Sequence, residues 1–164
     1  MSSRPNVIWV FGDQHRRQLL GCEGDPNVRT PNIDNLAEYG TRFSRAYSNF
    51  PLCCPARGTL LTGLHGHACI PGHNYCLPEE QTTVAHLLND AGYHTAWFGK
   101  WHVDGPITSK RGEDPVYEHR PRHPEAPKDG YHRECQIYKP VEARGGFETW
   151  LGYENNNAPH NPWV

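Results

Sequence analysis

The sequence contains no apolar run long enough to cross a membrane. The longest run near its start is Val7–Phe11, whereas a membrane-spanning helix needs about 20 apolar residues. A secretory signal, with a basic start, an apolar middle and a small-residue cleavage site, is also missing. We therefore expect no membrane partner. The expected location is the cytoplasm as the sequence stands, or the periplasm or exterior if an export signal was removed.

The sequence also lacks a strong charge of either sign and a regular cysteine pattern. Lys and Arg number 16 and Asp and Glu 18, which gives a formal net charge of −2. This balance gives no reason to expect a nucleic-acid partner. The six cysteines are irregularly spaced, and a chain of 164 residues does not need a disulfide framework. We therefore expect reduced thiols.

What the sequence does contain is the composition of a globular domain. Hydrophobic residues make up 36% and charged residues 21% of the chain, which is typical of one compact domain with a core. The first half alternates strand-like and helix-like segments. We predict a strand over Val7–Phe11, buried on both faces of a parallel sheet. We also predict a helix from Pro31 to Gly40, a short strand over Arg42–Tyr47 and a helix over Ala56–Leu61.

A second clear helix follows in the middle of the chain. We predict that Thr82 or Thr83 caps it and that Gly92 ends it. Its predicted apolar face carries Val84, Leu87, Leu88 and Ala91. A further buried strand over Tyr93–Phe98 completes an alternating order of strands and helices, which predicts an α/β layered fold. Residues 104–146, rich in Pro, Gly and His, are predicted to form a long loop or insertion.

The strongest chemical signal is a Cys-x-Pro-x-Arg pattern formed by Cys53, Pro55 and Arg57, with Leu-Leu-Thr-Gly following. By itself, this cysteine fits either an activated thiolate near a helix start or one member of a structural cysteine pair. The whole pattern resembles the first signature of the sulfatases, in which a dedicated enzyme oxidises the cysteine to formylglycine. Only Cys53 fits the register, because Cys54 falls at a variable position.

A second segment supports the same resemblance. Gly92–His102 is similar to the second sulfatase signature, a strand that ends in Gly-Lys-x-His, although Phe98 stands where a smaller residue is more usual. Thr30–Asp34 and Ala46–Ser48 also match the opening pattern of the family. The resemblance covers the chain from Pro5 to about Asp104.

The resemblance implies a fold and a domain boundary. It implies an alkaline-phosphatase-like α/β/α sandwich with a mostly parallel central sheet, apparently truncated. Residues 1–164 would be the N-terminal portion of a sulfatase catalytic domain, with the C-terminal part of the domain absent.

The resemblance also implies a cofactor and the residues that hold it. The expected cofactor is a divalent metal, Ca²⁺ in the first place and Mn²⁺ or Mg²⁺ as alternatives, with oxygen ligands that suit such ions. Asp13, Gln14 and the hydrated formylglycine made from Cys53 would be its ligands in this chain. Gln14 stands where many members carry a second Asp. The Asp-Gln start resembles that of some relatives, including choline-sulfatase-like enzymes and phosphonate monoester hydrolases that prefer Mn²⁺. The expected protein partner is the formylglycine-generating enzyme.

Four residues carry the implied chemistry: Cys53 as the precursor of the nucleophile, Arg57, Lys100 and His102. Arg57 would hold the hydrated aldehyde, Lys100 would bind a sulfate oxygen as charge builds, and His102 would orient the nucleophile or assist proton transfer. The spacing of Lys100 and His102 places them on one side of a strand end. The alternatives without a catalytic role are that Lys100 is an ordinary solvated lysine and that His102 is a loop histidine.

The resemblance implies hydrolysis of sulfate esters, of a sulfated carbohydrate or an aryl ester. One alternative is a phosphonate or phosphate ester hydrolase of the same superfamily, and another is a catalytically incomplete fragment that only binds metal or ligand. His65, His67, Cys69, His73 and Cys76 could instead form a zinc site, and His65 or His67 could contact substrate. His160 is a weaker active-site candidate.

Overall fold

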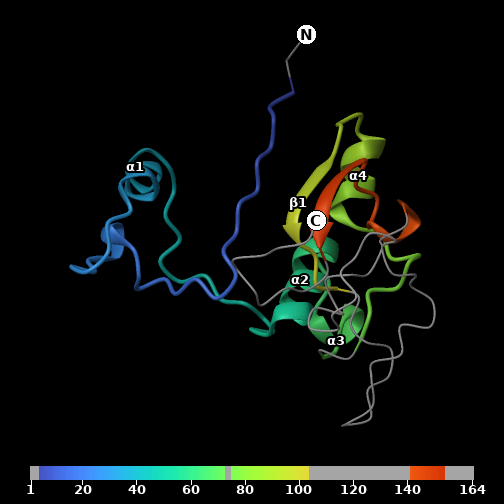
Figure 1. Ribbon diagram of the computed structural model, residues 1–164, viewed down its shortest axis with the longest axis horizontal. Helices are drawn as coiled ribbons and strands as arrows, with labels where there is room; N and C mark the ends of the chain where they lie inside the picture. Colours follow the sequence, from blue (N-terminus) through green and yellow to red (C-terminus); the bar gives the residue numbers. More distant parts are fainter. Residues whose placement is uncertain (1–3, 73–74, 104–140, 154–164) are drawn as a thin grey trace, which may run out of the picture. The chain divides into compact units, whose positions relative to one another are not determined.

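The computed structural model describes residues 4–72, 75–103 and 141–153. The chain divides into two compact units, Met1–Tyr47 and Ser48–Val164, shown in blue tones and in green to red tones in Figure 1. No helix in the described ranges is long and apolar enough to cross a membrane.

The first unit contains a short 3-10 helix, η1 (Gly21–Glu23), and one α-helix, α1 (Pro31–Tyr39). Helix α1 begins after Thr30 and ends at Gly40, as predicted. The Thr30 hydroxyl links the two helices: it accepts a hydrogen bond from Gly21 N (2.8 Å) and donates one to Asp34 Oδ1 (2.8 Å). Cys22 N also donates a hydrogen bond to Asp34 Oδ1 (2.7 Å), so Asp34 and Thr30 together hold η1 against the first turn of α1.

Two ion pairs with Glu23 lie next to η1. Arg17 Nη2 lies 2.5 Å and Arg42 Nη1 lies 3.3 Å from the Glu23 carboxylate. The hydrogen bond from Arg17 lowers the pKa of Glu23 below its ordinary value. This pair therefore stabilises the unit above the ordinary pKa of a glutamate, and the contribution is lost as the pH falls through the lowered value.

Two strand predictions for the first unit are wrong. Neither Val7–Phe11 nor Arg42–Tyr47 forms a strand, and the side chain of Ile8 is 86% exposed. A strand buried on both faces needs neighbours on its edges and layers over its faces. The two strands that pair in the described ranges pair only with each other, and no residue of 4–47 is buried.

The second unit begins with the helix that carries the first signature. Helix α2 (Cys53–Thr62) starts three residues before the predicted position. Proline fits in the first turn of a helix, where its missing N–H costs nothing, so Pro55 does not delay the start. Gly63, with φ 71°, ends the helix, and the short helix α3 (Gly66–Cys69) packs beside it.

Helix α4 (Val84–Asp90) starts with a capping box that decides between the two predicted caps. Thr83 Oγ1 accepts a hydrogen bond from Ala85 N (3.2 Å), and Thr83 N donates one to His86 Nδ1 (3.1 Å). The predicted apolar face is wrong in detail, because Ala85 is buried whereas Leu87 is 61% exposed.

The sheet consists of β1 (Ala96–Lys100) and β2 (Thr149–Tyr153), which run parallel from the pair Ala96↔Thr149 to the pair Lys100↔Tyr153. Figure 1 shows the two arrows side by side near α4. The α/β class with a parallel sheet is thus confirmed. The predicted strand over Tyr93–Phe98 starts later than expected, and it is not buried on both faces, since Phe98 is 68% exposed.

The predicted loop over 104–146 lies mostly outside the described residues. Its last part, residues 141–146, forms a 3-10 helix, η3 (Val141–Ala143), and a turn with two glycines, Gly145 and Gly146, at positive φ. This turn leads directly into β2.

Candidate active site

The two adjacent cysteines at the start of α2 differ sharply in exposure. Cys54 is 0% exposed and belongs to the hydrophobic core, whereas Cys53 is half-buried. Of the two thiols, Cys53 is therefore the one that a modifying enzyme or a substrate can reach.

Arg57 follows Cys53 by one helical turn and lies on the same helix face. Its side chain is 5% exposed, and Nη1 donates a hydrogen bond to the Lys100 carbonyl oxygen at 2.6 Å. This bond joins the first predicted signature to the second across 43 residues of sequence. The helix that starts at Cys53 is therefore tied to the end of β1.

Lys100 and His102 lie at that strand end with alternating burial. Both are half-buried, while Trp101 between them and Val103 after them are buried in the core. The two predicted catalytic residues are thus more exposed than the two core residues that alternate with them. A helix start, a guanidinium and an ammonium all carry positive charge, and such an arrangement suits an anionic substrate.

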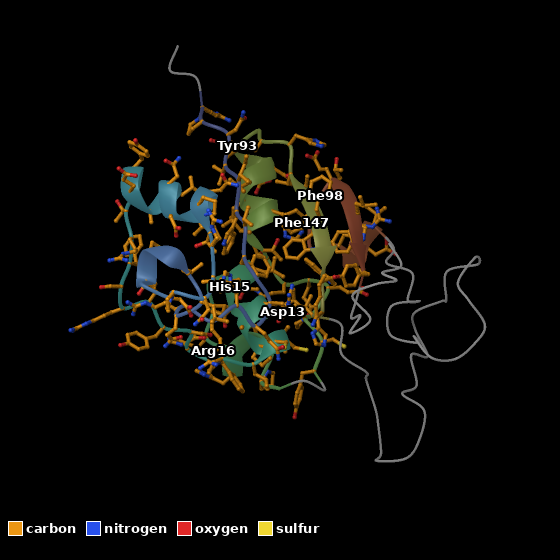
Figure 2. The ribbon with its side chains drawn as sticks, turned by 60° about the vertical axis from the view of Figure 1, so that its left-hand side comes forward. Asp13, His15, Arg16, Tyr93, Phe98 and Phe147 are labelled. Carbon is orange, nitrogen blue, oxygen red and sulfur yellow. The ribbon has the colours of Figure 1, made fainter. Side chains whose placement is uncertain are left out.

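Asp13 and Gln14 belong to the first unit, where they form a bend after the extended segment. Figure 2 labels Asp13 and the nearby His15. Gly12 is required at this bend, because a Cβ there would lie 2.8 Å from the Cβ of His15. The bend presents a carboxylate and a carboxamide oxygen, which are ligands that hard divalent cations prefer.

Two predicted site residues have unusual backbone conformations. Gln14 (φ 55°) and His102 (φ 51°) are the two non-glycine residues with positive φ in the described part of the chain. Such conformations cost free energy and are concentrated at functional sites.

Two histidines of the alternative zinc prediction lie away from Cys53. His65 and His67 follow the last residue of α2, at the opposite end of that helix from Cys53. Their rings stack at 5.8 Å, and Asn49 Nδ2 lies 3.1 Å from His65 Nδ1. No group of three or more His, Cys, Asp or Glu side chains that could hold a metal occurs in the described ranges. His73 and His160 fall outside them.

Sequence reasoning treated the position of Trp101 as variable, yet this residue connects Lys100 to His102 and lies in the core. Strand alternation carries the missed signal: if Lys100 and His102 share one side, Trp101 must point to the other.

A sequence model of the sulfatase family matches residues 5–160. The chain belongs to the sulfatase family. This match includes both signature segments and the bend with Asp13. An ulvan-active sulfatase from Formosa agariphila is 34% identical over 155 residues, which cover 93% of this chain and 25% of that protein. An endo-4-O-sulfatase from Bacteroides thetaiotaomicron is 34% identical and covers 98% of this sulfatase chain and 33% of the relative.

The fold agrees with this family. The solved yidJ protein from Bacteroides fragilis, described as a candidate sulfatase, superposes with a TM-score of 0.66 at 29% identity, over 88% of this chain and 30% of that protein. The sulfatase chain therefore has the alkaline-phosphatase-like α/β fold of its family, and it spans about a quarter to a third of the length of these relatives.

Proposed function

We propose that the protein hydrolyses sulfate esters, of a sulfated carbohydrate in the first place and of an aryl ester as the alternative, with formylglycine made from Cys53. The observation that carries the proposal is the bond from Arg57 to the Lys100 carbonyl. It ties the helix of the nucleophile to the strand end of the proposed sulfate-binding lysine. The names of the ulvan-active and endo-4-O-sulfatase relatives support a sulfated carbohydrate as substrate.

Each of the four predicted catalytic residues, all in the second unit, has a role in the proposal. Converted to formylglycine by a dedicated enzyme, Cys53 would supply a hydrated aldehyde oxygen that attacks sulfur while the bond from sulfur to the alcohol oxygen breaks and the alcohol leaves. Deprotonation of the second hydroxyl would then break the bond to the sulfate group, release sulfate and restore the aldehyde. Arg57 holds this group and offsets negative charge around it. Lys100 binds a sulfate oxygen as charge builds on the ester. His102 orients the nucleophilic hydroxyl or takes its proton through the imidazole ring.

The proposal includes a divalent cation, Ca²⁺ before Mn²⁺ or Mg²⁺, because Asp13 and Gln14 present hard oxygen donors on one bend. When bound, the cation supplies positive charge that polarises a sulfate ester. Asp13 contributes a carboxylate and Gln14 a neutral oxygen.

A related activity deserves a parallel test because of Gln14. A neutral amide in place of a second carboxylate leaves less negative charge at the bend, and it favours a phosphonate or phosphate ester hydrolase of the same superfamily as the second candidate.

The test uses the full-length protein from its native host. Mass spectrometry of the Cys53 peptide should show conversion of the thiol to the aldehyde. An aryl sulfate and an aryl phosphonate are then assayed in parallel with Ca²⁺ or Mn²⁺, and the sulfate ester should turn over faster. Cys53→Ala should abolish turnover, while Cys54→Ala serves as the matched control. An unmodified Cys53 thiol or faster turnover of the phosphonate would overturn the proposal.

A further inference from the structure

The residue between Lys100 and His102 is anchored more firmly than either of them. Trp101 is 1% exposed. Its backbone N donates to the Tyr153 carbonyl oxygen at 2.7 Å, one residue beyond the last β1–β2 pair. Its indole meets Trp97 edge-on at 5.0 Å and Trp150 at 4.9 Å.

Ring contacts, and not a hydrogen bond, hold this indole. Its Nε1 is buried and has no hydrogen-bond acceptor among the described residues. Phe147, which Figure 2 labels, adds a further ring from the turn before β2, with its centroid 6.1 Å from that of Trp101. The orientation of Trp101 is therefore set by the shape of its surroundings.

One part of those surroundings is a glycine. Gly145 has φ +57°, and a Cβ on it would lie 2.9 Å from Cη2 of Trp101. The Gly145 carbonyl accepts a hydrogen bond from Thr83 Oγ1 at 2.5 Å. The backbone of this turn thus touches the indole and is itself held by the cap of α4.

The backbone on both sides of Trp101 is held as well. The Lys100 carbonyl accepts from Arg57, and the Val103 carbonyl accepts from Leu77 N at 2.7 Å. Between these two points, His102 adopts its left-handed conformation. A displacement of the indole must therefore be absorbed by the short stretch that carries Lys100 and His102.

We propose that Trp101 is a positioning residue for Lys100 and His102, and that Gly145 sets the place of its indole. The inference rests on the proposed function. It means that a turn more than 40 residues later in the sequence controls the alignment of two groups that act on the sulfate ester.

Two variants test this positioning in the full-length protein. Gly145→Ala adds a methyl group against the indole, and Trp101→Phe shortens the ring without removing a hydrogen bond to any described residue. Gly63→Ala is the matched control: Gly63 also has positive φ, +71°, but a Cβ on it has nothing within 4 Å. Melting temperatures verify that each variant is folded.

We expect Gly145→Ala and Trp101→Phe to lower kcat by about 10- to 100-fold, since small misplacements of catalytic groups have such effects, with KM changed less than about threefold. Gly63→Ala should retain the kcat of the parent. In a His102→Ala background, Gly145→Ala should lose most of its effect, because groups that act through one another are not additive. Equal kcat losses in Gly145→Ala and Gly63→Ala, or full additivity with His102→Ala, would overturn the inference.

A crystal structure of Gly145→Ala separates this inference from the proposed function. Displaced Lys100 and His102 side chains support positioning even if no sulfate ester is turned over. Unmoved side chains overturn it even if the enzyme is a sulfatase.

Discussion

At the scale of single residues, two neighbouring cysteines have opposite environments. Cys53 is the first residue of α2 and is half-buried, whereas Cys54 is enclosed in the core with Leu61 and Ile70. Loss of the Cys54 thiol therefore removes packing in the core, whereas loss of the Cys53 thiol removes an accessible reactive group.

We expect Cys54→Ala to lower the free energy of unfolding by about 1–2 kcal/mol, because truncation of a buried side chain leaves space that neighbours fill only partly. Cys53→Ala should change it by less than about 0.5 kcal/mol, as is usual outside the core. Urea unfolding of both variants measures the difference. Equal losses would show that the two side chains are packed alike.

At the scale of elements, α4 fastens the turn that leads into β2. Thr83 at the start of the helix binds the Gly145 carbonyl, and Asn89 near its end donates to the Gly146 carbonyl at 2.7 Å. Thr95, just before β1, donates its hydroxyl proton to Asn89 Oδ1 at 2.8 Å. One helix therefore sets the approach of both strands.

Replacement of the cap tests this fastening. Thr83→Ala leaves Ala85 N without its side-chain acceptor and the part-buried Gly145 carbonyl without its donor. We expect it to lower the free energy of unfolding by about 1–3 kcal/mol. Thr82→Ala, at an exposed threonine one residue earlier, should cost less than about 0.5 kcal/mol. Thermal or urea unfolding compares the two, and a similar cost for both would argue against the cap.

Local signals predicted the elements whose ends are chemically marked. Helix α1 starts at a Thr-Pro pair and ends at a glycine, as predicted. For α4, the sequence left Thr82 and Thr83 as the two candidate caps, and Thr83 is the cap. The capping box itself was hidden because His86 stands where a Glu or Gln is usual. The prediction of a strand over Val7–Phe11 is wrong, because an apolar segment forms a strand only where partner strands are present to pair with it.

For the candidate site, the sequence predicted residues in two segments that the structure brings together. The signatures predict Cys53, Arg57, Lys100 and His102 as site residues, and this stays a prediction. The structure adds the hydrogen bond from Arg57 to the Lys100 carbonyl, which joins the two segments. The contact of Gly145 with Trp101 could not be predicted, because it depends on a β1–β2 register between segments about 50 residues apart in sequence. No periodicity within either strand encodes that register.

At the scale of the whole molecule, the two units differ in how they are stabilised. The second unit contains every buried residue of the described ranges. The first unit depends on hydrogen bonds around Asp34 and ion pairs around Glu23. Exposed ion pairs contribute little to stability, so we expect the first unit to open more readily.

Hydrogen exchange of the 164-residue chain measures this difference. Amides of residues 7–11 should exchange at least about 100-fold faster than those of β1, because local opening is easiest where few apolar contacts are buried. The β1 amides serve as the internal reference. Equal protection of the two segments would show that residues 7–11 are paired in solution.

The residues on either side of 104–140 are held by other parts of the second unit. The Val103 carbonyl is bound by Leu77 N, and Ala143 is buried just after Val141. A parallel pair such as β1 and β2 needs a crossover connection, but its pairing sets no length for that connection. Val103 and Val141 are therefore defined junctions for chimeras, and we expect the β1–β2 register to persist when the sequence between them is exchanged for that of another sulfatase.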